Sequence, residues 1–131
     1  MTASRRSRAK PARLLTEFEL EVMTVLWRLG EATVATLLAE LPRQPLAYTS
    51  VSTMVRILEQ KGFVGSRKEG RLHVYAPLLP KQEYETVALR HVIGKLFDGA
   101  PLNLVRCLVA AEELSAADVA ALQALLKGKR R

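Results

Sequence analysis

One segment, residues 46–77, limits the fold more than any other part of the chain. Its first half has the spacing of an amphipathic helix, and Gly62 gives that helix a stop. Its second half predicts two short strands joined by a turn at Glu69-Gly70, because glycine accepts the positive φ that tight turns need. A short helix followed at once by a hairpin predicts a helix-turn-helix core with an attached β wing.

The predicted helix has two faces of different chemistry. At 100° per residue one stripe is apolar, and it consists of Val51, Met54, Val55 and Leu58. The opposite face, with Ser52 at its flank, carries Thr49, Thr53, Arg56 and Gln60. Short hydroxyl side chains let a helix come close to base edges, and an arginine can reach guanine or phosphate. We therefore predict that this face reads a DNA major groove; the alternatives are an ordinary solvated face and capping of the helix N-terminus by Ser or Thr.

Basic side chains surround the predicted turn of the hairpin, namely Arg67, Lys68 and Arg71. Wing tips of this kind usually contact phosphate, which positions a protein on a duplex without reading its sequence. In the second strand Leu72 and Val74 share one face while Tyr75 takes the other, and this alternation predicts a half-buried strand.

Two further helices are predicted before this segment. The run from Thr16 to Glu19 matches a capping box, so a helix should begin there, and Gly30 should end it. Its apolar stripe is Phe18, Val22, Val25, Leu26 and Leu29, widened by Met23 and Trp27. A second helix should run from Thr33 to about Leu41. Three short helices with a tight turn between the second and the third make a helix-turn-helix core.

Residues 80–131 predict three more amphipathic helices, the last of them capped by Ser115. So few residues bury too little surface to make a good core by themselves. We therefore expect them to pack with a second copy, in a homodimer whose two-fold symmetry suits a palindromic operator; a self-contained three-helix cap is the alternative. The expected dimerisation residues are Val92, Ile93, Leu96, Phe97, Leu104, Leu108, Leu122 and Leu125.

The predicted fold class is mainly α with a small β-hairpin. It consists of a disordered basic arm at 1–13, a winged helix-turn-helix DNA-binding domain at 14–79, and a C-terminal helical dimerisation region with a basic tail at 80–131. The formal net charge of +7 favours polyanionic partners such as double-stranded DNA. The arm either touches DNA or only aids solubility.

Several classes of function are excluded by what the sequence lacks. No apolar run is long enough for membrane insertion and no secretory signal is evident, so we expect a cytoplasmic protein. The single cysteine, Cys107, excludes an internal disulfide and is expected to be a small buried hydrophobe rather than a redox sensor. Without a spaced metal-ligand set, a glycine-rich phosphate loop or a nucleophile motif, we expect no metal, no cofactor and no enzyme activity.

Several runs of residues resemble one known family. The run Leu15–Trp27 is similar to the first helix of the penicillinase repressor family, which includes methicillin-resistance and copper-transport repressors. Thr49–Val64 resembles the recognition helix and the start of the wing of that family, and Arg71–Pro77 resembles its return strand. Leu96–Gly99 and Glu112–Leu114 recur in its dimerisation region, so the match covers roughly residues 14–127.

The resemblance implies a homodimeric transcriptional repressor on a dyad-symmetric operator, controlling an operon of the β-lactamase or cell-wall stress type. By position, the base contacts and nearby phosphate contacts would come from Thr49, Ser50, Ser52, Thr53 and Arg56. The wing would be supported by Arg67, Lys68 and Arg71.

The chain departs from the family pattern in two places. In the β-lactam-responsive members a membrane sensor peptidase acts in induction and an Asn-Phe bond is cut. The aligned pair here, and so the candidate cleavage site, is Cys107-Leu108, which argues against that route. The C-terminal cysteine cluster of the copper-responsive members is absent. Two alternatives stay open: a winged-helix regulator that senses a small molecule directly, and a winged-helix module for protein-protein assembly.

Overall fold

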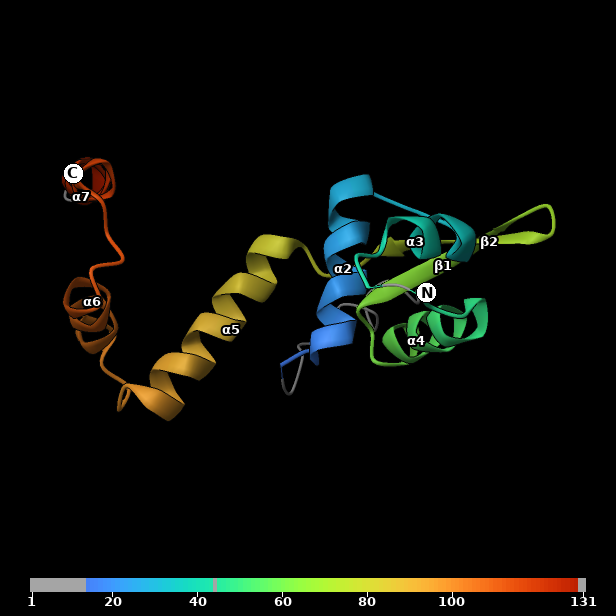
Figure 1. Cartoon of the computed structure of the whole chain (residues 1–131), viewed down its shortest axis with the longest axis horizontal. Helices are drawn as coiled ribbons and strands as arrows, with labels where there is room; N and C mark the ends of the chain where they lie inside the picture. The colour runs from blue at the N-terminus through green and yellow to red at the C-terminus, as the bar shows by residue number, and fades with distance from the viewer. Residues whose placement is uncertain (1–13, 44, 130–131) are drawn as a thin grey trace. The chain divides into compact units, whose positions relative to one another are not determined.

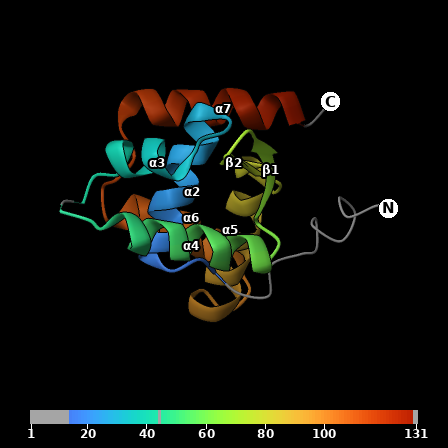
Figure 2. The same ribbon diagram turned by 90° about the vertical axis from the view of Figure 1, so that its right-hand side faces the viewer.

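A computed structural model of the chain describes residues 14–43 and 45–129. The predicted arm at 1–13 and the last two residues of the basic tail lie outside the described residues. The chain divides into two compact units, one reaching to Ala88 and one beginning at Leu89 (Figure 1). In the first unit three helices pack on one another, and the hairpin follows the third of them (Figures 1 and 2).

The first helix, α2 (Glu17–Leu29), begins as predicted. Thr16 accepts a hydrogen bond from the Glu19 amide at 3.2 Å, and Glu19 Oε1 accepts one from the Thr16 amide at 2.8 Å, which completes the capping box. Gly30 ends the helix with a φ of 89°, a conformation that other residues rarely adopt. Its buried apolar side chains are Val22, Met23, Val25 and Leu26. The prediction for Leu29 is wrong, because this side chain is exposed in the last turn.

The next two helices form the helix-turn-helix. The helix α3 (Val34–Glu40) is capped by Thr33, whose hydroxyl accepts from the Thr36 amide at 3.2 Å. The helix α4 (Tyr48–Gln60) begins two residues later than the predicted segment. Its predicted apolar stripe is largely confirmed, since Val51, Val55 and Leu58 are fully buried and Met54 is partly buried. These side chains join α2 and α3 in one hydrophobic cluster.

The hairpin consists of β1 (Val64–Glu69) and β2 (Leu72–Pro77), paired antiparallel from Val64↔Pro77 to Glu69↔Leu72. The turn is therefore formed by Gly70 and Arg71, one residue later than predicted, and Gly70 has a φ of 63°. The positive φ lies at the first position of the turn, and glycine adopts this backbone conformation without strain. The end of the hairpin projects beyond α3 and α4 (Figure 1).

The predicted alternation along β2 is wrong at two positions, Leu72 and Tyr75. Leu72 is exposed because it lies at the far end of the hairpin, and Tyr75 is buried together with Val74. Tyr75 forms a bridge with Ala32, in which the two backbones exchange hydrogen bonds of 2.8 and 2.9 Å. The loop between α2 and α3 therefore pairs with the second edge of β2 at Tyr75.

The core of the first unit includes residues beyond the hairpin. Leu79 is buried, and its carbonyl accepts a hydrogen bond of 2.8 Å from Trp27 Nε1. Tyr84 is buried on the helix α5 (Lys81–Leu96); its hydroxyl accepts from the Leu15 amide at 2.9 Å, and its ring lies 5.9 Å from that of Trp27. Because of these contacts the compact unit extends to Ala88, past the predicted boundary between 79 and 80.

The second unit contains the end of α5 and the helices α6 (Pro101–Ala110) and α7 (Ala116–Lys129). The predicted cap at Ser115 is present, since its hydroxyl accepts from the Asp118 amide at 3.0 Å. The structure describes every residue of α6 and α7, and within a single chain none of these residues is buried. The prediction that Cys107 is buried is wrong, because the side chain is exposed on α6.

Candidate nucleic-acid interface

The face of α4 that carries hydroxyls and an arginine lies at the surface of the first unit. Its exposed residues are Thr49, Ser50, Thr53, Arg56 and Gln60, and Ser52 is half-buried. Arg56 Nη2 donates to Ser52 Oγ at 3.2 Å, one turn away. The N-cap residue is Ala47, and no side chain among the described residues caps the helix. The capping alternative is therefore wrong, and the hydroxyls are left for other partners.

A groove of 540 Å³ runs between α4, β2 and the start of α3. It is lined by Thr33, Val34, Ala35, Tyr48, Ser52, Arg56, Glu59, Arg71, Leu72, His73 and Tyr75. The structure thus brings Ser52 and Arg56 of the helix together with Arg71 of the wing turn. Sequence reasoning missed Tyr48, an exposed aromatic side chain at the first position of α4. An aromatic residue directly before a Ser/Thr-rich face was the signal available.

The groove contains a buried phenol. Burial raises the pKa of Tyr75, the charge of Glu59 raises it further, and the charge of Arg56 lowers it. Its hydroxyl is therefore a neutral donor at physiological pH. Glu59 itself accepts a hydrogen bond of 2.7 Å from Ser66 on β1, which ties the end of α4 to the base of the wing.

A second contact fixes the end of α4 against α2. Lys61 Nζ lies 2.5 Å from Glu19 Oε2, and Glu19 is only 3% exposed. Burial alone raises the pKa of Glu19, but the hydrogen bonds from Lys61 and Thr16 and the charge of Lys61 lower it below its ordinary value. The carboxylate is thus ionised at neutral pH and holds the helix that carries the candidate reading face.

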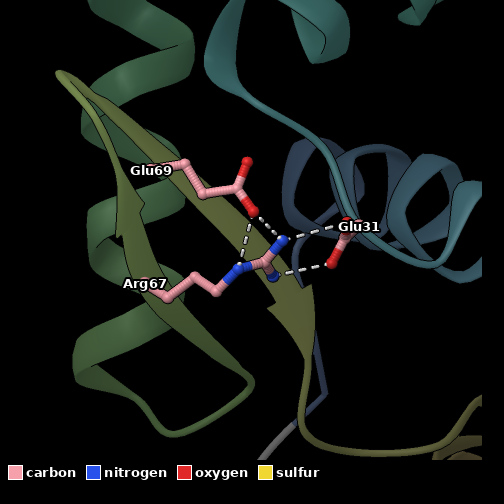
Figure 3. A network of polar contacts seen from close by, with 3 residues as sticks. All are labelled: Glu31, Arg67 and Glu69. Atoms are coloured by element: carbon pink, nitrogen blue, oxygen red, sulfur yellow. Dashed lines mark hydrogen bonds and ion pairs between the residues drawn. The ribbon is translucent and has the colours of Figure 1, made fainter.

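The three basic residues of the wing differ in their surroundings. Lys68 and Arg71 are exposed, and neither makes an ion pair with any residue that the structure describes. Arg67, by contrast, makes hydrogen bonds to two carboxylates, Glu31 and Glu69 (Figure 3). The bonds to Glu31 and then to Glu69 raise the pKa of Arg67 above its ordinary value. Phosphate contact therefore stays a straightforward prediction for Lys68 and Arg71, and Arg67 has other partners.

Comparison with known proteins identifies the family of the chain. The family model for the penicillinase repressor matches residues 15–128. The chain belongs to the penicillinase repressor family. Its relatives include the penicillinase repressor of Bacillus licheniformis, 25% identical over 114 residues that cover 86% of this chain and 89% of the relative. The methicillin resistance regulatory protein MecI of Staphylococcus aureus (strain N315) is 25% identical over 112 residues, covering 85% of this chain and 91% of the relative.

A solved structure supports the fold of the same family. The solution structure of the DNA binding domain of the repressor BlaI matches with a TM-score of 0.50 and 29% identity, over 59% of this chain and 93% of that chain. As a member of the penicillinase repressor family, the chain is a winged-helix transcriptional repressor and not an enzyme. Among the described residues, no three metal-ligating side chains are grouped, and no helix is long and apolar enough to cross a bilayer.

Proposed function

We propose that this repressor acts as a homodimer on a dyad-symmetric operator, with α4 of each copy in a major groove. The observation that carries the proposal is the exposed hydroxyl and arginine face of α4 beside a basic wing. A recognition helix usually meets base edges with its N-terminal residues, and here that end carries short hydroxyls with no capping duty. The relatives, named as repressors of penicillinase and regulators of methicillin resistance, support the same activity.

We assign the contacts by their place in this arrangement. Base edges and nearby phosphates would be contacted by Thr49, Ser50, Ser52, Thr53 and Arg56. Arg56 has the reach to bind guanine, and the hydrogen bond to Ser52 holds its guanidinium beside the reading face. Lys68 and Arg71 would bind the phosphate backbone on the wing side, where they add affinity without sequence preference.

The second unit supports the homodimer. In a single chain, large apolar side chains stay exposed on all three of its helices; Leu96 is 70% and Leu125 is 68% exposed. Exposed apolar area of this kind on a small helical unit is covered by association. A second copy is the partner we assign, through Val92, Ile93, Leu96, Phe97, Leu104, Leu108, Leu122 and Leu125.

For the regulated genes, the support comes from the named relatives. We propose an operon of the β-lactamase or cell-wall stress type, because both named relatives act on penicillinase or methicillin resistance. Cys107-Leu108 stands where the β-lactam-responsive members have the Asn-Phe bond, so cleavage by a membrane sensor peptidase is not part of the proposal. The pair lies within α6, so a peptidase would gain access only when this helix opens locally.

The proposal is tested by selecting the genomic DNA fragments that the full chain binds and determining the enriched motif. We expect an inverted repeat whose half-sites lie about one helical turn, or a multiple of it, apart. Affinity for random duplex should fall steeply as salt rises, because bound phosphates release counterions. Negligible affinity for any duplex at low salt would instead favour the assembly alternative.

A further inference from the structure

Arg67 makes more polar contacts than any other residue of the wing that the structure describes. Its Nη1 and Nη2 donate to the two carboxylate oxygens of Glu31 at 2.7 and 3.2 Å. Its Nε and Nη2 donate to Glu69 Oε2 at 3.1 and 2.6 Å. Figure 3 shows the guanidinium held between the two carboxylates. A planar guanidinium suits this geometry, and the ammonium of a lysine does not.

The two carboxylates come from different parts of the first unit. Glu69 lies two residues along β1, whereas Glu31 lies 36 residues away in the loop between α2 and α3. Glu31 directly precedes Ala32, which pairs with Tyr75 on the edge of β2 that faces away from β1. Arg67 therefore reaches from β1 across β2 to the loop, next to the two backbone hydrogen bonds of the Ala32 bridge.

The charges of this cluster do not favour phosphate. One guanidinium with two carboxylates leaves a net charge of −1, so Arg67 adds no free cation to the wing. Its side chain is 49% exposed and that of Glu31 is 51% exposed, and single ion pairs of such exposure contribute little. A bidentate pair within a network is the arrangement in which exposed charges do fix geometry.

We propose that Arg67 is a positioning residue that fastens the wing to the loop between α2 and α3. It thereby sets where Lys68 and Arg71 meet the DNA backbone, and it does not bind phosphate itself. This inference rests on the proposed DNA-binding function and revises the role that the sequence assigned to Arg67.

Two variants and one control separate fastening from phosphate binding. Arg67→Lys keeps the positive charge, but the lysine ammonium cannot make the paired hydrogen bonds that the guanidinium makes to both carboxylates. Glu31→Gln removes the distant partner and leaves every wing cation in place. Glu40→Gln is the matched control, because it removes a carboxylate from another exposed ion pair, with Arg28 at 2.8 Å, outside the candidate interface.

If Arg67 fastens the wing, Arg67→Lys and Glu31→Gln each weaken binding to the selected operator fragment about threefold to tenfold, with an unchanged salt dependence. Glu40→Gln then stays within about twofold of the wild type. If Arg67 binds phosphate, Arg67→Lys keeps the wild-type affinity. Glu31→Gln then binds operator and random duplex more tightly, because the carboxylate that competes with phosphate for Arg67 is gone. That second pattern would overturn the inference while leaving the proposed function intact.

A readout without DNA completes the test in the full chain. Hydrogen exchange at the Ala32 and Tyr75 amides should be faster in Arg67→Lys and Glu31→Gln than in Glu40→Gln, because the bridge loses its reinforcement. Equal exchange in all three variants would refute the fastening role even if no operator were found.

Discussion

Glu19 is the buried carboxylate on which the position of the candidate reading helix depends. Replacing it by glutamine removes the charged hydrogen bond to Lys61 and keeps an oxygen that can accept from the Thr16 amide in the capping box. We expect Glu19→Gln to lower the free energy of unfolding by about 1–3 kcal/mol at pH 7, measured by urea denaturation. Glu17→Gln removes an exposed carboxylate from the same turn and should stay within about 0.5 kcal/mol of the wild type.

The pH dependence of this contribution follows from the direction of the shift. Because the pKa of Glu19 is lower in the folded state, its stabilisation is complete above the unfolded pKa of about 4.3 and is lost as pH falls through the lower folded pKa. The stability difference between wild type and Glu19→Gln should therefore shrink as the pH is lowered below about 4. A difference that stays constant down to pH 3 would contradict the assigned ionisation.

The reading face is tested by single side chains on α4. Arg56→Ala and Thr53→Ala should each weaken binding to the selected operator by on the order of 1–3 kcal/mol, because a lost base contact lowers discrimination between sequences. Affinity for random duplex should change less. Gln60→Ala at the far end of the same face is the comparison. Wild-type operator affinity in both test variants, measured by fluorescence anisotropy, would remove this face from the interface.

Local contacts were predictable from the sequence and distant ones were not. The capping box joins residues three positions apart, so the run Thr16–Glu19 suffices to identify it. Glu19 and Lys61 are 42 positions apart, and Arg67 and Glu31 are 36 apart. No periodicity links such pairs, so only the folded chain shows that Arg67 is hydrogen-bonded to carboxylates.

The N-terminus of α4, like that of α6, is not capped by a side chain among the described residues. Ala47 already has the extended backbone of an N-cap residue, with φ −85° and ψ 145°. Ala47→Ser should therefore raise the free energy of unfolding by about 1 kcal/mol, because its hydroxyl can accept a free backbone N–H. Ala39→Ser within α3 is the control and should lose about 0.5 kcal/mol. Urea denaturation giving the same sign for both would contradict the assigned start of α4.

The type and order of the elements were predictable because each has its own signal. Helical periodicity identified the helices of the first unit, and Gly62, where φ is 89°, identified the end of α4. The hairpin was found, but its turn was placed one residue early, since Glu69-Gly70 and Gly70-Arg71 are both compatible with a tight turn. The burial of Tyr75 depends on its bridge to Ala32, which strand alternation alone does not reveal.

For the whole molecule, the compact units define where the chain can be divided. A chain ending at residue 88 keeps Tyr84, with its contacts to Leu15 and Trp27, whereas a chain ending at residue 79 loses them. We expect the longer fragment to have the higher melting temperature in a calorimetric scan. Both fragments should sediment as monomers that bind a half-site weakly, while the full chain sediments as a dimer. If the 1–88 fragment sedimented as a dimer, the second unit would not be the one responsible for association.

The division into two units also explains why the sequence alone did not predict where the first core ends. Composition indicated a helical second half but not where the first core ends, because Tyr84 lies four residues beyond Pro80 on a helix that enters both units. The exposed apolar residues of α6 and α7 match the expectation that these helices lack a core of their own.

The hairpin has one further consequence, for solubility. Among the described residues β1 pairs only with β2, so its other edge presents backbone groups to which a strand of another molecule could add. The exposed part of that edge carries Ser66, Arg67, Lys68 and Glu69. Charged side chains along a short edge discourage such addition. The charged edge should thus keep the projecting wing from pairing with strands of other molecules at high protein concentration.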